Sequence, residues 1–171
     1  PASPMRRVKM PQLPQDLLPP FSRAEARALL DACDEERDTA LLLVLLDCGV
    51  RASELCALNV GDVDLVTGEV RVRRGKGSKD RVTFVGARTR KALLRYLATR
   101  PGTQPTAPLF VTLTTGTRLT YWGLRSLLER IGDRAGVDDC EAHRFRRTFA
   151  IESLRARMPV MQLAAMMGHG S

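Results

Sequence analysis

The chain has 171 residues, enough for one domain with a core of ordinary size. Hydrophobic residues make up 44% and charged residues 27%, a balance typical of a folded globular protein and not of a disordered or fibrous one. The longest apolar run, residues 40–46, is far shorter than the ~20 residues that a membrane-spanning helix needs. These values exclude a membrane span and favour a single domain.

Positive charge is in clear excess. The chain has 27 Lys and Arg against 19 Asp and Glu, a formal net charge of +8 and a pI near 10.0. Arginine predominates, and its planar guanidinium fits phosphate oxygens well. The excess indicates a polyanionic partner, either a nucleic acid or an anionic membrane surface, although charged residues also cover faces exposed to water.

The cysteines are widely separated and show no paired Cys-x-x-Cys spacing, which argues against a disulfide scaffold and against a zinc ribbon. We therefore expect a reducing compartment, the cytoplasm. The four cysteines are Cys33, Cys48, Cys56 and Cys140.

The amino-terminal segment differs in composition from the rest. Residues 1–20 combine six prolines with several basic side chains, which predicts an extended basic linker before a domain over residues 21–171. Ser22 and Glu25 then have the spacing of a capping box, in which each side chain accepts a hydrogen bond from a free amide at a helix start. A helix to about Cys33 is expected to follow.

The middle of the chain changes from helical to strand periodicity. The apolar run 40–46 predicts a buried helix that ends near Gly49, and residues 50–55 begin another helix. Residues 69–85 alternate with period two around a turn at 75–80, which predicts a β-hairpin.

Helical patterns resume after the hairpin. Thr120 is a suitable N-cap, and Pro159 is acceptable at the first position of a last helix. The predicted fold class is α+β, mainly α-helical with a small antiparallel β-sheet. The helices expected here are 87–99, 120–135, 141–158 and 159–167.

One of the chain's two histidines lies in a cationic helical segment. His143, Arg146 and Arg147 share one face of the predicted helix, whereas Phe145 and Phe149 share another. An isolated helical histidine is more often a structural residue. The adjoining arginines favour an anion-binding face instead, because clustered cations repel one another without an anion to receive them.

A second group of cations occupies the hairpin turn at residues 74–81. Its glycines allow close approach of the backbone to a ligand, and Lys76 at the tip could reach into a groove. A charged turn exposed to water explains the same residues. The segment is not a nucleotide-binding P-loop, because Val70 stands where that motif requires glycine and Gly77 where it requires Ser or Thr.

Arg51 directly follows the most apolar helix. An unpaired guanidinium is costly to bury, so Arg51 is expected to face either Glu54, three residues on, or an external anion. The spacing leaves both interpretations open.

Four segments resemble, in order and separation, the sequence boxes of the tyrosine recombinase family, which includes phage integrases and Xer-like proteins. Residues 49–55, GVRASEL, are similar to the first arginine box, and residues 75–81, GKGSKDR, to the lysine turn. Residues 143–150, HRFRRTFA, are similar to the second arginine box, and residues 167–171, MGHGS, to the segment with the second histidine. The resemblance runs from about Leu17 to the end of the chain, with Phe145 in place of a usual Leu and Arg147 in place of a usual His.

The resemblance implies a site-specific recombinase that cleaves and rejoins double-stranded DNA through a 3′-phosphotyrosyl intermediate, without metal or cofactor. Arg51 and Arg146 would clamp the non-bridging phosphate oxygens, with His169 as a further donor. Lys76 would protonate the 5′-oxygen leaving group, and His143 would exchange the proton of the nucleophile. The further residues expected to contact DNA are Arg74, Lys79, Arg81 and Arg147.

The nucleophile is not found at the matching place. In the family a tyrosine follows the second histidine, whereas this sequence ends at Ser171, and neither Tyr96 nor Tyr121 occupies the corresponding position. We therefore expect a sequence truncated before the catalytic tyrosine and inactive by itself. The resemblance further implies a homotetramer on DNA for the full-length protein, a monomer for the fragment, and a location at the cytoplasmic nucleoid.

Two other kinds of enzyme fit less well. A metal-dependent nuclease would use Asp62 and Asp64 with Asp47, but the first two are better explained as turn and cap residues. A zinc site from Cys140, His143 and His169 lacks a fourth ligand. A non-catalytic DNA-binding module of the same fold remains the alternative that is not an enzyme.

Overall fold

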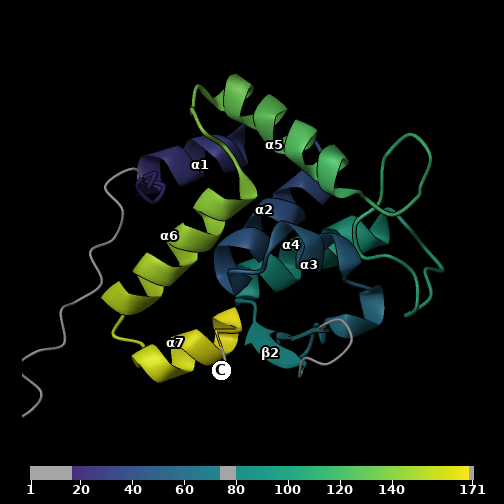
Figure 1. Ribbon diagram of the computed structural model, residues 1–171. Helices are drawn as coiled ribbons and strands as arrows, with labels where there is room; N and C mark the ends of the chain where they lie inside the picture. Colours follow the sequence, from purple (N-terminus) through teal and green to yellow (C-terminus); the bar gives the residue numbers. More distant parts are fainter. Residues whose placement is uncertain (1–16, 74–79, 170–171) are drawn as a thin grey trace, which may run out of the picture.

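The computed structural model describes residues 17–73 and 80–169, and in this part of the chain helices predominate (Figure 1). A two-stranded antiparallel sheet lies between the third and fourth helices, as the fold class predicted. The helices are α1 (Arg23–Asp31), α2 (Glu36–Cys48), α3 (Ala52–Ala57), α4 (Ala87–Ala98), α5 (Tyr121–Ala135), α6 (Ala142–Arg155) and α7 (Val160–Met167). The strands are β1 (Glu69–Val72) and β2 (Arg81–Phe84), preceded by the short 3-10 helix η2 (Val60–Asp62).

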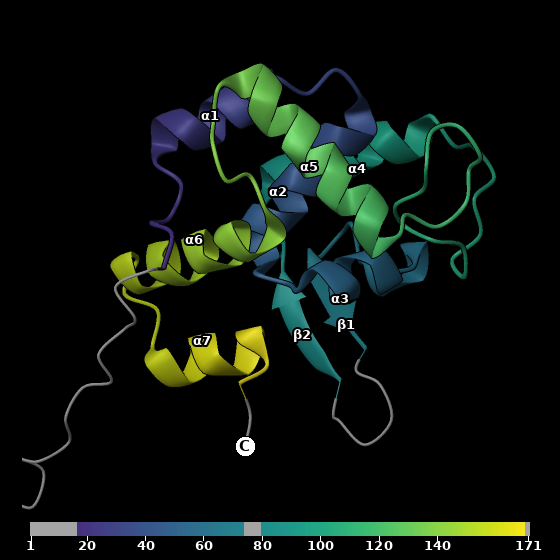
Figure 2. The ribbon, with the colours of Figure 1, turned by 45° about the horizontal axis from the view of Figure 1, so that its top comes forward.

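Helix α2 forms the centre of the core, because its sequence is apolar all round. It packs against α4 and α6, while α5 covers α1 and α3 (Figure 2). Residues 40–45 of α2 are almost completely buried. The helix ends at Gly49, which has φ of 58°, a conformation that glycine adopts without strain.

The capping box predicted for α1 is confirmed. Ser22 Oγ accepts from the amide of Glu25 at 3.1 Å, and Glu25 Oε2 accepts from the amide of Ser22 at 2.8 Å. The chain just before this helix lies against α6, since Arg144 Nε donates to the carbonyl oxygen of Pro19 at 2.9 Å. Residues 1–16 lie outside the described part, so the linker and its boundary at residue 21 stay predictions.

The hairpin has the two predicted strands, but the inner face of the second strand is polar. Its register pairs Val72 with Arg81, and the buried residues of β2 are Arg81 and Thr83, whereas Val82 and Phe84 are exposed. Thr83 Oγ1 donates to the carbonyl oxygen of Cys48 at 3.3 Å. Polar side chains can face inward here because they meet hydrogen-bonding partners there.

The carboxyl-terminal helices differ slightly from the prediction. Helix α6 ends at Arg155, earlier than expected, and Arg157 adopts a positive φ of 63° that turns the chain. Pro159 is the N-cap of α7 and not its first helical residue. Both views place α7 beside β2 and below α6 (Figures 1 and 2). Among the described residues, no helix combines the length and the apolar character needed to cross a bilayer.

Candidate active site

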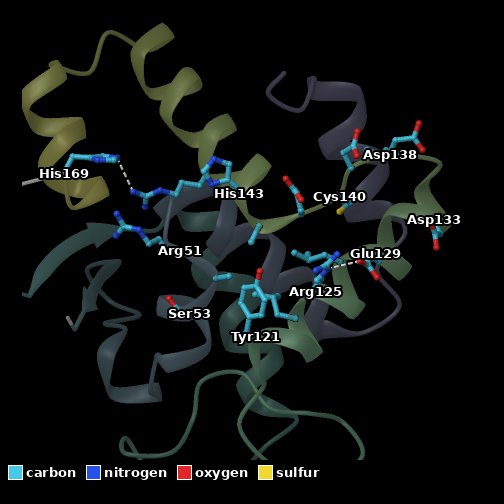
Figure 3. A pocket seen from close by; sticks show the side chains of 18 residues that line it. Arg51, Ser53, Tyr121, Arg125, Glu129, Asp133, Asp138, Cys140, His143 and His169 are labelled. Atoms are coloured by element: carbon cyan, nitrogen blue, oxygen red, sulfur yellow. Dashed lines mark hydrogen bonds and ion pairs between the residues drawn. The ribbon is translucent and has the colours of Figure 1, made fainter. Parts of the chain in front are cut away.

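A cavity of about 780 Å³ opens between α3, α5, α6 and the residues after α7 (Figure 3). One end is cationic and the other is acidic. Such a charge gradient draws the negative groups of a ligand to the cationic end. The cationic end is lined by Arg51, His143, Arg146 and His169. The other end is lined by Glu129, Asp133 and Asp138, together with Arg125, which pairs with Glu129 (Figure 3).

Arg51 is the N-cap residue of α3, two residues after the glycine that ends α2. Its Nη1 lies 3.2 Å from Glu54 Oε1, and its side chain is 45% exposed. The sequence left two partners open for Arg51, and the geometry is compatible with both. One edge of the guanidinium contacts Glu54, while the exposed part lines the cavity and can meet an external anion.

Arg146 is the buried cation of the site. From the first half of α6, its Nη1 donates to the carbonyl oxygen of Gly49 at 2.5 Å and its Nη2 to that of Met167 at 2.8 Å. Nη2 also lies 3.3 Å from His169 Nε2, the contact drawn in Figure 3. Arg146 therefore links the end of α2 with the end of α7.

The two histidines reach the cavity from different helices. His143 is exposed in the first turn of α6, and His169 follows Gly168, which ends α7 with φ of 74°. The amide of His169 donates to the carbonyl oxygen of Ala164 at 2.9 Å, a bond that closes the helix end. Figure 3 shows the labelled side chains of Arg51, His143 and His169 grouped at the same end.

The structure thus gathers four of the five predicted catalytic residues, Arg51, His143, Arg146 and His169, at one end of one cavity. The fifth, Lys76, lies outside the described residues, as do Arg74 and Lys79 among the predicted DNA contacts. The placement brings the residues together, and their catalytic roles stay predictions.

The two predicted DNA contacts that lie among the described residues differ in exposure. Arg147 is partly buried on α6. The side chain of Arg81 is only 7% exposed, and it pairs with Glu54 through Nη1 to Oε1 at 2.7 Å and Nη2 to Oε2 at 2.8 Å. Arg81 is therefore not available at the surface, and the expectation that it contacts DNA is corrected. The reason is its inward position in the strand register, where a carboxylate receives it.

Glu54 has one more partner in the site than its spacing from Arg51 predicts. Its carboxylate joins Arg51 and Arg81. Burial alone would raise the pKa of Glu54, but hydrogen bonds from Arg81 and from the Arg51 amide, with the two guanidinium charges, lower it to about 2. The Arg-x-x-Glu spacing was a usable signal for the first contact, whereas nothing local indicated the second.

The carboxylates of the nuclease alternative serve as caps. Asp62 Oδ2 accepts from the amide of Asn59 at 2.8 Å, and Asp64 Oδ1 from the amide of Val66 at 2.8 Å. Asp47 Oδ2 accepts from the amide of Gly86 at 2.8 Å. Within residues 17–73 and 80–169, no group of three His, Cys, Asp or Glu side chains is arranged to hold a metal ion.

The chain is similar in sequence to known proteins. A sequence model of the phage integrase family matches residues 21–171. Tyrosine recombinase XerC of Haemophilus ducreyi is 30% identical over 169 residues, which cover 96% of this chain and 55% of that protein. The chain thus spans a little over half the length of this curated relative.

Solved structures share the fold. The crystal structure of XerA recombinase superposes with a TM-score of 0.83 and 32% identity, covering 92% of this chain and 58% of that one. The Tn1549 transposon integrase, solved in complex with a circular intermediate DNA, gives a TM-score of 0.77 at 21% identity, covering 93% of this chain and 61% of that one.

Proposed function

This chain belongs to the phage integrase family, and we propose that its cavity is the active site of a tyrosine-type site-specific recombinase that breaks and rejoins DNA. The observation that carries the proposal is the meeting of Arg51, Arg146, His143 and His169 at one end of the cavity. They come from three separate places in the sequence, since His143 and Arg146 both belong to α6. Such a group suits an anionic centre, because fixed cations repel one another when no anion is bound.

The proposed reaction begins with attack of a tyrosine hydroxyl on the scissile phosphorus. As the new bond between oxygen and phosphorus forms, the bond to the 5′-oxygen breaks, and negative charge grows on the non-bridging oxygens. Arg51 and Arg146 stabilise this charge with preorganised donors, and His169 adds a third. Attack by a 5′-hydroxyl on the same phosphorus reverses the step and rejoins the strand.

Two proton transfers complete the reaction. His143 takes the proton from the tyrosine hydroxyl, because an imidazole can accept and return a proton near neutral pH. The departing 5′-oxygen needs a proton because an alkoxide is a poor leaving group, and we assign this donor to Lys76, as the family resemblance implies. No step requires a metal ion or an organic cofactor.

We propose double-stranded DNA as the substrate and partner. The net charge of +8 favours a polyanion, and the related Tn1549 integrase and XerH recombinase were solved with DNA. We further propose that the full-length protein assembles as a homotetramer on two duplexes, at the cytoplasmic nucleoid. Arg147, Arg74 and Lys79 are assigned to backbone phosphates.

Covalent trapping tests the proposal. With the full-length gene product, a nicked suicide substrate, which loses its 5′-hydroxyl strand after cleavage, should yield a protein–DNA adduct that survives denaturant. Arg51→Ala and Arg146→Lys should each bind DNA with near-normal affinity and give little or no adduct. If the wild-type protein forms no adduct, while both variants weaken binding by similar small amounts, the chain is a DNA-binding module without catalysis.

A further inference from the structure

Arg81 makes three side-chain hydrogen bonds next to the site, yet the proposed chemistry gives it no role. Its Nη1 and Nη2 form a two-pronged pair with the carboxylate of Glu54, at 2.7 and 2.8 Å. Its Nε donates to the carbonyl oxygen of Met166 at 2.6 Å. Each edge of the buried guanidinium therefore contacts a different part of the fold.

The first connection leads to Arg51. Glu54 Oε2 accepts from the amide of Arg51 at 2.8 Å, and Glu54 Oε1 lies 3.2 Å from Arg51 Nη1. The shorter contacts of Glu54 are thus with Arg81, and the longer one is with the side chain of Arg51. Since one carboxylate is shared by two guanidiniums, a positive charge remains uncompensated and faces the cavity.

The second connection leads to His169. Arg81 holds the carbonyl oxygen of Met166, and Arg146 holds that of Met167, so two cations bind the last turn of α7. Free carbonyls and partial negative charge at a helix end favour this arrangement. His169 follows this turn after Gly168, and its amide donates to the carbonyl oxygen of Ala164, so whatever fixes the turn also fixes the backbone that carries the imidazole.

Helix α7 depends on such anchors because little apolar surface holds it. It has eight residues, too few to be stable as an isolated helix. Its buried side chains pack with Phe149 in a small cluster that is separate from the main core around α2. Val160 and Met161, at its amino-terminal end, are exposed.

We propose that Arg81 is a positioning residue for the active site, acting on Arg51 through Glu54 and on His169 through the end of α7. This inference rests on the proposed function. Without Arg81, the carboxylate of Glu54 is free to pair fully with Arg51 and to draw that guanidinium away from the phosphate. The end of α7 also loses one of its two arginine anchors.

The test compares Arg81→Gln and Arg81→Lys with a matched control. Arg73 directly follows Val72, the residue of β1 that pairs with Arg81, and its Nε pairs with Asp62 at 2.9 Å, but its side chain is 62% exposed. Arg73→Gln therefore removes the same charge from the same hairpin without touching Glu54 or α7. All variants are made in the full-length gene product and checked for folding by thermal denaturation.

The first readout is the rate of adduct formation on the suicide substrate at saturating DNA. Arg81→Gln should lower this rate at least tenfold, about 1.4 kcal/mol, with DNA affinity changed less than about threefold. Arg81→Lys should fall between Arg81→Gln and wild type, and Arg73→Gln should match wild type. In an Arg51→Ala background, Arg81→Gln should lower the rate of adduct formation much less, because the Arg51 side chain on which Arg81 acts is absent.

The second readout is amide hydrogen exchange in α7, which needs no catalysis. Arg81→Gln should speed exchange in the last turn of α7, and Arg73→Gln should not. If the wild-type protein forms no adduct, the proposed function fails, and exchange still decides whether Arg81 anchors α7. If wild type forms the adduct and Arg81→Gln matches it in rate and exchange, the inference is overturned. Should Arg81→Gln not fold, Arg81→Lys decides by the same comparison.

Discussion

The carbonyl oxygen of Gly49 accepts a hydrogen bond from Arg146 Nη1 at 2.5 Å, between residues that are 97 positions apart in the chain. The contact is possible because Gly49 ends α2 in the left-handed conformation and lets α6 come close. A Cβ built on Gly49 would overlap the ring of Phe149, one turn after Arg146. The glycine therefore serves both the packing of Phe149 against the end of α2 and the active site.

Substitution of Gly49 should be severe. Gly49→Ala adds left-handed strain and a steric clash, and should lower the free energy of unfolding by about 3 kcal/mol, measured by chemical denaturation. Gly136→Ala is the matched control, because Gly136 also has a positive φ, of 66°, but has nothing within 4 Å of an added Cβ. The free energy of unfolding of Gly136→Ala should fall by only about 1 kcal/mol. Equal losses in the two variants would contradict the role given to the Phe149 contact.

The two arginines of the proposed phosphate clamp should differ in their effect on stability. Arg51→Ala should change the free energy of unfolding by less than about 1 kcal/mol, because the side chain is half exposed with one ion pair. Arg146→Ala should lower it by about 2–3 kcal/mol, since the carbonyl groups of Gly49 and Met167 lose their donor.

Denaturation at neutral pH measures this difference. Both variants should nevertheless lose adduct formation on the suicide substrate. If Arg146→Ala were as stable as Arg51→Ala, this would contradict the claim that Arg146 stabilises the fold by linking the end of α2 with the end of α7.

The carboxyl of Glu54 should make stability depend on pH. Its pKa is about 2 in the folded protein against an ordinary value of 4.5, so the ionised form stabilises the fold. This contribution is complete above pH 4.5 and is lost as the pH falls toward 2. We expect it to reach about 2 kcal/mol, after allowance for screening by solvent.

Comparison of unfolding curves between pH 7 and pH 2 tests this expectation. Glu54→Gln should be less stable than wild type at pH 7 by about 2 kcal/mol, and the difference should shrink as the pH approaches 2. Glu129→Gln removes a carboxylate from an exposed pair with Arg125 and should change stability by less than about 0.5 kcal/mol. If the loss of stability in Glu54→Gln were constant across this pH range, a lowered pKa of Glu54 would be excluded.

Tyr121 should not be the nucleophile, although it lines the cavity at the start of α5. The other tyrosine of the chain, Tyr96, is buried, and its hydroxyl accepts from the Arg100 side chain at 3.2 Å. The family resemblance places the nucleophile after His169, so Tyr121→Phe should keep adduct formation within about threefold of wild type. Mass spectrometry of the adduct peptide identifies the attacking residue, and a DNA-linked Tyr121 would refute this assignment.

DNA cleavage should be insensitive to chelators. The proposed charge stabilisation comes from Arg51, Arg146 and His169, so EDTA should leave the rate of adduct formation unchanged. A loss of cleavage that added Mg²⁺ restores would instead support a metal-dependent nuclease.

Local features were predictable wherever neighbouring residues decide the conformation. The capping box of Ser22 and Glu25, the end of α2 at Gly49 and the pairing of Arg51 with Glu54 each depend on residues a few positions apart. The alternation in the hairpin likewise predicted two strands. Four boxes in order were enough to indicate the family, which the match over residues 21–171 confirms.

The sequence by itself therefore determined the helices, the hairpin, the excess of positive charge and the residues that could bind a phosphate. The partners of the buried arginines were decided only by the tertiary structure. Arg81 meets Glu54 and Met166 across 27 and 85 positions, and Arg146 meets Gly49 across 97. A guanidinium has the same local sequence signal whether it faces water or a buried carboxylate, because its environment depends on which distant segments pack around it.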